Sequence, residues 1–166
     1  ASDLVCNLSK GMLSMLTVII GLASKAEITI LDEPAAGLDV IVREEFYKLI
    51  IDEQQENGRT FIISTHIIEE AANVFEEVII LKDKCVYLKE NTVELLDKCR
   101  YVSGLEEDVK NAVDGCKIIN EEHIGRSYAV TVMQDGDGKI KAVQHVTVQP
   151  VSLQNLFIAI CGQSNM

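Results

Sequence analysis

The sequence is short of basic residues. Only 15 Lys and Arg stand against 26 Asp and Glu, so the formal net charge is −11. A surface with this balance repels the phosphates of nucleic acids and of anionic lipids. We therefore expect no nucleic acid among the partners.

Long apolar runs and paired cysteines are also missing. The longest apolar stretch near the N-terminus, Met12 to Ala23, is too short to cross a bilayer. The five cysteines are scattered, and no C-x-x-C pair occurs among them. An odd, scattered set fits a reducing compartment and argues against a disulfide framework. The composition therefore indicates a cytosolic globular protein.

A third absence concerns phosphate binding. No G-x-x-x-x-G-K-[ST] occurs in the sequence, so no P-loop of this kind can cradle the phosphates of a nucleotide. The chain also begins just upstream of Leu8 without an initiator Met. We expect it to be a fragment of a longer polypeptide.

An apolar run that ends in two carboxylates is the most informative stretch present. Ile28 to Leu31 is followed directly by Asp32, Glu33 and Pro34. Such a run predicts a strand buried on both faces of a parallel sheet, and ligands lie beyond the carboxyl ends of such strands. One carboxylate there can hold Mg²⁺ through water, and the other can polarise an attacking water. The alternative is a loop that happens to be acidic.

Flanking motifs resemble those of one known family. Leu8-Ser9-Lys10-Gly11-Met12 lies upstream, Ala36-Gly37-Leu38-Asp39 follows the carboxylates, and Ser64-Thr65-His66 ends a second apolar run. In this order they resemble the second half of the ATPase domain of ABC transporters: the signature loop, the Walker B strand, the D-loop and the switch histidine. The resemblance is good over residues 4–90. Lys10 and Met12 depart from the common LSGGQ form and resemble an exporter-like subfamily.

The resemblance implies a role for each matching residue. It implies that Glu33 and His66 are catalytic residues and that Asp32 binds Mg²⁺ through water. It implies nucleotide contacts by six further residues: Leu8, Ser9, Lys10, Gly11, Met12 and Asp39. The implied cofactors are ATP and Mg²⁺, bound by the parent protein and weakly or not at all by the fragment. We expect the chain alone not to hydrolyse ATP.

The resemblance also implies partners and a location. An ABC ATPase subunit pairs with a second ATPase subunit, identical or not, and docks on a transmembrane permease subunit. We therefore expect a cytoplasmic protein, peripheral at the cytoplasmic face of the cell membrane through its permease. Two alternatives stay open: an ABC-type ATPase of DNA repair or chromosome maintenance, and a non-catalytic regulatory or interaction module.

The predicted fold class is α/β. We expect residues 1–99 to form part of the parallel sheet of an ABC ATPase, a P-loop NTPase fold, with flanking helices. Residues 100–166 should form a small α+β accessory module. The expected helices and strands alternate along the chain. The helices are residues 13–23, 40–57, 67–75, 92–99, 105–113 and 151–157, and the strands are residues 28–33, 60–63, 78–81, 85–88, 128–133 and 139–149.

The missing P-loop strand predicts an exposed apolar edge. In the family this strand lies beside the one that ends at Ser64, so its absence leaves Phe61 to Ile63 without a neighbour. Exposed apolar strand edges pair with other chains. We therefore expect the fragment to self-associate or to exchange strands.

Overall fold

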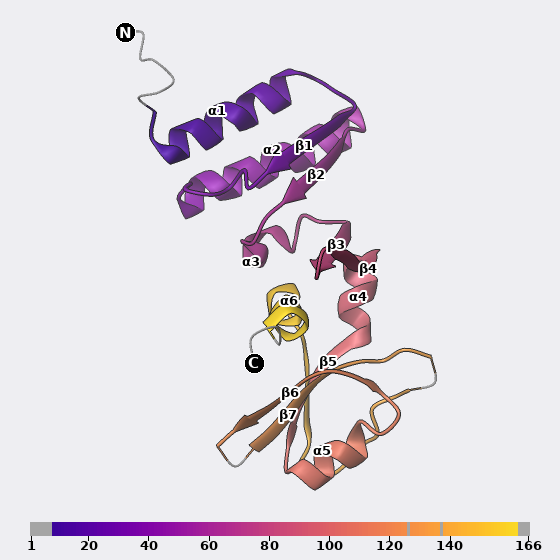
Figure 1. The fold of residues 1–166 in the computed structure, drawn as a ribbon. Coiled ribbons are helices and arrows are strands. Elements are labelled where there is room, and N and C mark those ends of the chain that lie inside the picture. Colours follow the sequence, from indigo (N-terminus) through magenta and orange to yellow (C-terminus); the bar gives the residue numbers. More distant parts are fainter. Residues whose placement is uncertain (1–7, 126, 137, 163–166) are drawn as a thin grey trace. The chain divides into compact units, whose positions relative to one another are not determined.

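The structure is a computed structural model that describes residues 8–125, 127–136 and 138–162 (Figure 1). It divides into two compact units, residues 1–74 and residues 75–166. The division predicted after Cys99 concerns where the ATPase-like part ends, and it stays a prediction.

The first unit is a β-α-β arrangement preceded by a helix. Its elements are α1 (Lys10–Ala23), β1 (Ile28–Asp32), α2 (Val40–Asn57), β2 (Thr60–Ser64) and the single turn α3 (Ile68–Ala71). The two strands pair in parallel, with Ile28 opposite Thr60 and Asp32 opposite Ser64. The carboxyl ends of both strands therefore lie at one edge of the sheet.

Capping residues set the ends of the two long helices. The Ser9 hydroxyl accepts a hydrogen bond from the Met12 amide at 3.2 Å, which begins α1. The Asp39 carboxylate accepts from the Val42 amide at 3.0 Å, which begins α2. Gly58 ends α2 in the left-handed conformation, at φ 63°. Side-chain oxygens at a helix start and Gly just past its end satisfy backbone groups that the helix leaves unpaired. Ser9 is a favourable N-cap residue and Gly58 a favourable helix stop in the sequence, and the structure confirms both, so the first helix begins three residues before the predicted Leu13.

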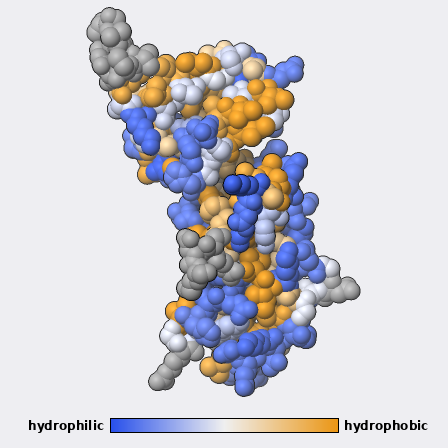
Figure 2. Space-filling model, viewed as in Figure 1, coloured by the Kyte–Doolittle hydropathy of each residue, from blue (hydrophilic) through white to orange (hydrophobic). Residues whose placement is uncertain are grey.

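One face of the β1–β2 sheet is covered and the other is open. Leu31 of β1 is buried, and α1 packs against β1 while α2 packs against β2. On the opposite face Ile28, Ile30 and Ile62 are 62%, 72% and 51% exposed. Figure 2 shows apolar surface in this unit. The prediction of a strand buried on both faces is wrong, because the described residues supply helices to one face only.

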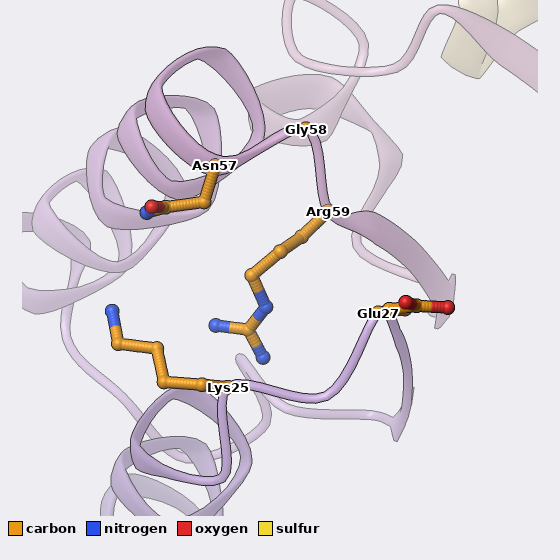
Figure 3. Close-up of a pocket in the computed structure, with 5 residues that line it drawn as sticks. All are labelled: Lys25, Glu27, Asn57, Gly58 and Arg59. Atoms are coloured by element: carbon orange, nitrogen blue, oxygen red, sulfur yellow. The ribbon is translucent and has the colours of Figure 1, made fainter.

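Arg59 joins three elements at the amino ends of the strands (Figure 3). Its guanidinium, 4% exposed, donates to the carbonyl oxygens of Gly21, Leu22 and Ala26 at 2.9–3.0 Å. It also donates to the Thr29 hydroxyl at 2.9 Å and to the Glu53 carboxylate at 2.8 Å. Because Lys25 contacts the same carboxylate, the end of α1, the start of β1 and the end of α2 meet on one side chain.

The second unit begins with an antiparallel hairpin and continues into a four-stranded sheet. The hairpin is β3 (Glu77–Lys82) with β4 (Cys85–Asn91). The remaining elements follow in chain order. They are α4 (Thr92–Lys98), β5 (Cys99–Gly104), α5 (Glu106–Ala112), β6 (Lys117–Ile124), β7 (Ser127–Met133), β8 (Thr147–Pro150) and α6 (Leu153–Cys161).

The larger sheet has the strand order β6-β7-β5-β8, with all neighbours antiparallel. In β5-α5-β6 the two strands flank β7, which is a split β-α-β arrangement. Its core holds Val109 and Ala112 of α5 against Val102 of β5 and Val130 of β7. The α+β character expected of the C-terminal residues is therefore present.

Three predictions about individual elements are wrong. Residues 139–146 form no strand, and only Thr147–Pro150 pairs, with β5. The turn residues from Gln134 to Gly138 predict a hairpin between residues 128–133 and 139–149, but β5 lies between β7 and β8. The helix expected over residues 67–75 shrinks to the single turn of α3. Strands β5 and β6 were not predicted; β6 alternates poorly because Glu121, Glu122 and His123 interrupt its apolar residues.

Candidate functional site

The candidate site lies at the carboxyl ends of β1 and β2. Parallel pairing places Asp32 opposite Ser64, so the residues that follow each strand emerge side by side. Glu33 follows β1, and Thr65 and His66 follow β2. The structure thus brings two adjacent predicted residues, Asp32 and Glu33, to the same edge of the sheet as His66, which follows Glu33 by 33 residues.

Asp32 and Ser64 form the first contact of the site. The Ser64 hydroxyl donates a hydrogen bond to Oδ1 of Asp32, and both residues are exposed. An exposed carboxylate and a hydroxyl are oxygen ligands of the kind that Mg²⁺ accepts. Among the described residues no cluster of three or more His, Cys, Asp or Glu side chains could hold a metal ion. Asp32 therefore suits Mg²⁺ as a single carboxylate ligand, with water and phosphate oxygens as the others.

Glu33 is held by the loop after β2. Its carboxylate accepts from the His66 amide at 3.1 Å and lies 2.8 Å from Nδ1 of the His66 ring, which donates to it. The Thr65 hydroxyl lies at 3.5 Å from the other carboxylate oxygen. The Glu33 amide donates to the carbonyl oxygen of Ser64 at 2.9 Å. Backbone and side chain of Glu33 are both fixed by residues 64–66.

The backbone of Glu33 is in the left-handed region, at φ 45°. A non-glycine residue rarely adopts this conformation, and such residues concentrate at functional sites. The turn that follows keeps Glu33 in place, because the Ala36 amide donates to the Glu33 carbonyl oxygen at 3.0 Å. The chain therefore leaves β1 sideways, and the carboxylate points to the end of β2.

The start of α1 packs against this same turn. A Cβ on Gly11 would stand 2.6 Å from the carbonyl oxygen of Gly37, and the Ser14 hydroxyl donates to the Ala36 carbonyl at 3.0 Å. Gly37 itself has a φ of 81°. A side chain at residue 11 would push α1 away from the turn. This close approach explains why glycine stands there.

The other predicted nucleotide contacts lie around these elements. Ser9 and Asp39 cap α1 and α2. Lys10 and Met12 are exposed, and Leu8 is half-buried. No hydrogen bond joins residues 8–12 to Glu33 or His66 among the residues that the structure describes. The segment is therefore near the site but is not part of the Glu33–His66 contact.

Sequence reasoning gave no role to a polar cluster on α2 and α3. Arg43 Nη1 lies 3.2 Å from Oε2 of Glu70, and Tyr47 is buried one turn after Arg43. Burial raises the pKa of the Tyr47 phenol, the Glu70 carboxylate adds to the rise, and Arg43 opposes it. The Glu33 carboxylate also raises this pKa. These three polar residues lie on two helical segments and form no recognisable sequence motif. The only signal in the sequence is that Arg43 and Glu70 have opposite charges.

No helix within the described ranges is both long and apolar enough to cross a membrane.

A protein-family model described as "AAA domain, putative AbiEii toxin, Type IV TA system" matches residues 5–72.

Among curated relatives, the chain is 24% identical over 161 residues to the ABC transporter ATP-binding protein YtrB of Bacillus subtilis, covering 93% of this chain and 55% of the relative. It is 34% identical over 152 residues to an uncharacterized ABC transporter ATP-binding protein of Methanocaldococcus jannaschii, covering 91% and 52%. It is 32% identical over 106 residues to the energy-coupling factor transporter ATP-binding protein EcfA2 of Staphylococcus saprophyticus, covering 64% and 37%.

Solved structures agree with these relatives. The dimeric structure of a bacterial ABC transporter cassette matches with a TM-score of 0.51 at 29% identity, over 55% of this chain and 39% of that one. An inward-facing, putative metal-chelate type ABC transporter matches with a TM-score of 0.50 at 17% identity, over 92% and 51%, which supports the fold alone.

The structure is a mixed α/β fold, and the solved structures that it resembles are ABC transporter domains of the P-loop NTPase fold. More particularly, the chain is a homologue of the ATP-binding proteins of ABC transporters. It spans about half the length of the first two relatives, 55% and 52%.

Proposed function

We propose that the chain is part of the ATP-hydrolysing subunit of an ABC transporter, which powers transport across a membrane. The observation that carries this proposal is the position of Glu33. Its carboxylate is fixed by His66 at the carboxyl ends of two parallel strands, where α/β proteins bind their ligands. The names of the relatives support the same reading.

In this proposal each residue of the site has one task. Glu33 is the base that polarises the attacking water. His66, whose Nδ1 donates to Glu33, donates from Nε2 to the γ-phosphate when both ring nitrogens carry a proton. Asp32 holds Mg²⁺, which supplies charge neutralisation at the phosphates when bound. Ser9, Gly11 and the N-terminus of α1 face nucleotide held by a partner ATPase subunit, because the amides of a helix start favour anions. Leu8, Lys10 and Met12 shape that loop, and Asp39 positions the start of α2.

The proposed partners are a second ATPase subunit and a transmembrane permease subunit. The solved cassette that this chain resembles is dimeric, which supports the first of these. A permease places the protein at the cytoplasmic face of the membrane, and the Lys10 and Met12 variant of the loop supports an exporter. The acidic surface, with a net charge of −11, argues against the alternative of a DNA-maintenance ATPase.

We further propose that the chain by itself does not hydrolyse ATP. Its sequence contains no phosphate-cradling G-x-x-x-x-G-K-[ST]. Asp32, Glu33 and His66 can act only on a nucleotide that other residues hold. If the chain alone is inactive, the alternative is that it has a regulatory or interaction role by itself.

The test uses the full-length gene product and the substitution Glu33→Gln. Turnover of Mg-ATP should fall by at least about 100-fold, since a general base contributes about 10²–10⁴-fold. Binding of Mg-ATP should persist, because the substitution removes the base and keeps the shape. Phosphate release and equilibrium nucleotide binding are the two measurements.

Glu56→Gln is the matched control. Glu56 is an exposed carboxylate on α2 and takes part in no ion pair among the residues described. The control should keep wild-type turnover. Unchanged turnover in Glu33→Gln, or a wild-type protein that never hydrolyses ATP, would refute the proposed function.

A further inference from the structure

Three buried polar atoms without a hydrogen-bond partner gather in one place. Four such side-chain atoms occur among the described residues, and three of them are Nε of Arg43, the hydroxyl of Tyr47 and Oε2 of Glu70. Arg43 and Tyr47 lie one turn apart on α2, and Glu70 lies on α3. Oε2 of Glu70 makes no hydrogen bond but lies 3.2 Å from Nη1 of Arg43 in an ion pair. Buried polar atoms are usually hydrogen-bonded, so a group of atoms that are not needs an explanation.

The cluster is linked to the Glu33–His66 contact by a short segment of chain. Glu70 follows His66 by four residues, and the Ile67 amide donates to the Thr65 hydroxyl at 3.0 Å, which ties the start of this segment to the end of β2. Burial raises the pKa of the Tyr47 phenol, and the Glu70 carboxylate adds more to the rise than the Glu33 carboxylate does. The ion pair between Arg43 and Glu70 therefore acts on the segment that carries His66.

Helix α3 cannot hold its own position. It has four residues, and its N-cap residue Ile67 provides no side-chain hydrogen bond. A single helical turn is unstable in isolation, because nucleation fixes several residues for one hydrogen bond. Besides the hydrogen bond from Ile67 to Thr65, it is joined to α2 by the ion pair between Glu70 and Arg43 at 3.2 Å, with side chains 33% and 17% exposed. Helix α2, in contrast, is long and capped at both ends.

We propose that Arg43 is a positioning residue that holds α3 through Glu70 and so keeps His66 against Glu33. Both His66 contacts, from the ring and from the amide, go to the same carboxylate oxygen of Glu33. A displacement of α3 would therefore break both together. The consequence for catalysis rests on the proposed function, whereas the positioning itself does not.

The first test measures the His66–Glu33 contact without any activity. In the full-length gene product, the amide and ring nitrogen resonances of His66 are assigned by NMR with the help of His66→Gln. Glu33→Gln should shift both resonances, because it replaces the acceptor. Arg43→Met should shift them as well, and adding Glu33→Gln to Arg43→Met should then change nothing further.

Three further variants decide the cause of that shift. Glu70→Gln removes the same ion pair from the other side and should reproduce the effect, which also serves if Arg43→Met does not fold. The double variant Arg43→Glu, Glu70→Arg re-forms the ion pair with the charges exchanged. In it, Glu33→Gln should again shift the His66 resonances. Lys48→Met breaks the exposed Lys48–Glu44 pair on the same helix and should leave His66 unchanged. Wild-type His66 resonances in Arg43→Met, with the response to Glu33→Gln retained, would overturn the proposal.

The second test is kinetic. Arg43→Met should lower kcat by about 10-fold or more with little change in KM for ATP, since small misplacements of a catalytic group are costly. In a His66→Ala background it should have no further effect. Equal losses in both backgrounds would mean a merely structural role and would overturn the proposal. A wild type without ATPase activity would refute the proposed function, and the NMR result would still decide the positioning role.

Discussion

Replacing Arg59 by Met should loosen the first unit more than any surface substitution. The guanidinium is 4% exposed and donates to three backbone carbonyls, one hydroxyl and one carboxylate. Met matches its bulk roughly but provides none of these donors. The carbonyls of Gly21, Leu22 and Ala26 would be left without their side-chain donor.

The magnitude follows from the burial of Arg59, which is 4% exposed against 18% for Glu53. Each buried acceptor that loses its donor costs about 1–3 kcal/mol. Lys25→Met removes the other cation on Glu53, but Lys25 is 61% exposed, and exposed pairs contribute about 0–1 kcal/mol. The structure therefore predicts a large difference between two substitutions that remove the same charge from the same carboxylate.

The assay should read the first unit separately, since a chain of two compact units need not unfold in one step. Hydrogen–deuterium exchange of peptides from α1, β1 and β2 gives the free energy of local opening. In Arg59→Met these peptides should exchange faster by about 100-fold or more, which corresponds to about 3 kcal/mol. Lys25→Met should change them by less than about 5-fold.

The same site predicts a pH dependence. Hydrogen bonds from Lys25 first and Arg59 second lower the pKa of Glu53 below its ordinary value. A carboxyl group whose pKa is lower in the folded state contributes stability above its unfolded pKa, and that contribution disappears as the pH falls through the folded pKa. Lowering the pH should therefore increase the exchange of these peptides in the wild type as Glu53 is protonated. Arg59→Met should weaken this pH dependence. Equal exchange in Arg59→Met and Lys25→Met would refute the reasoning.

Three further outcomes are expected. Gly11→Ala places a Cβ 2.6 Å from the Gly37 carbonyl oxygen and should cost about 1–3 kcal/mol of stability, measured by calorimetry; an unchanged transition would show that α1 does not pack as described. Self-association is expected from the apolar strand edge at Phe61 to Ile63. Ile30→Thr should reduce it by removing further apolar surface, since Ile30 is 72% exposed on the open face of the sheet; a monomeric wild type in light scattering at micromolar concentration would count against the expectation. Burial raises the pKa of the Cys99 thiol to about 11, so alkylation near pH 8 should label exposed Cys85 and spare Cys99 until unfolding; mass spectrometry would reveal the opposite order.

The first unit could be predicted well from the sequence because its signals are local. Ser9, Asp32 and Gly58 stand at the ends of elements, and apolar runs between them identify strands and helices. The candidate site was predictable for the same reason, since Glu33 and His66 directly follow two such strands. What the sequence could not provide was the contact itself, because the left-handed conformation of Glu33 depends on the turn it enters.

The second unit was harder because its pairing is not local. The turn residues from Gln134 to Gly138 predicted a hairpin, but β7 pairs with β5 and β6 instead. Strand β6 is mostly exposed and contains Glu121 and Glu122, so its sequence is more typical of a loop than of a strand. The packing of the core around Val102 and Val130 decides the order of the strands in the sheet. This order cannot be predicted from a single sequence.

The β1-α2-β2 crossover keeps nearly all of the candidate site within one continuous stretch, from Ile28 to Glu70. Asp32, Glu33 and His66 lie on that stretch together with Arg43, which reaches Glu70 at its far end. The geometry of the site therefore does not depend on pairing between distant parts of the gene. A segment of this kind can be exchanged between homologues as one block, so that a chimaera inherits the whole constellation at once and recombination need not rebuild it residue by residue.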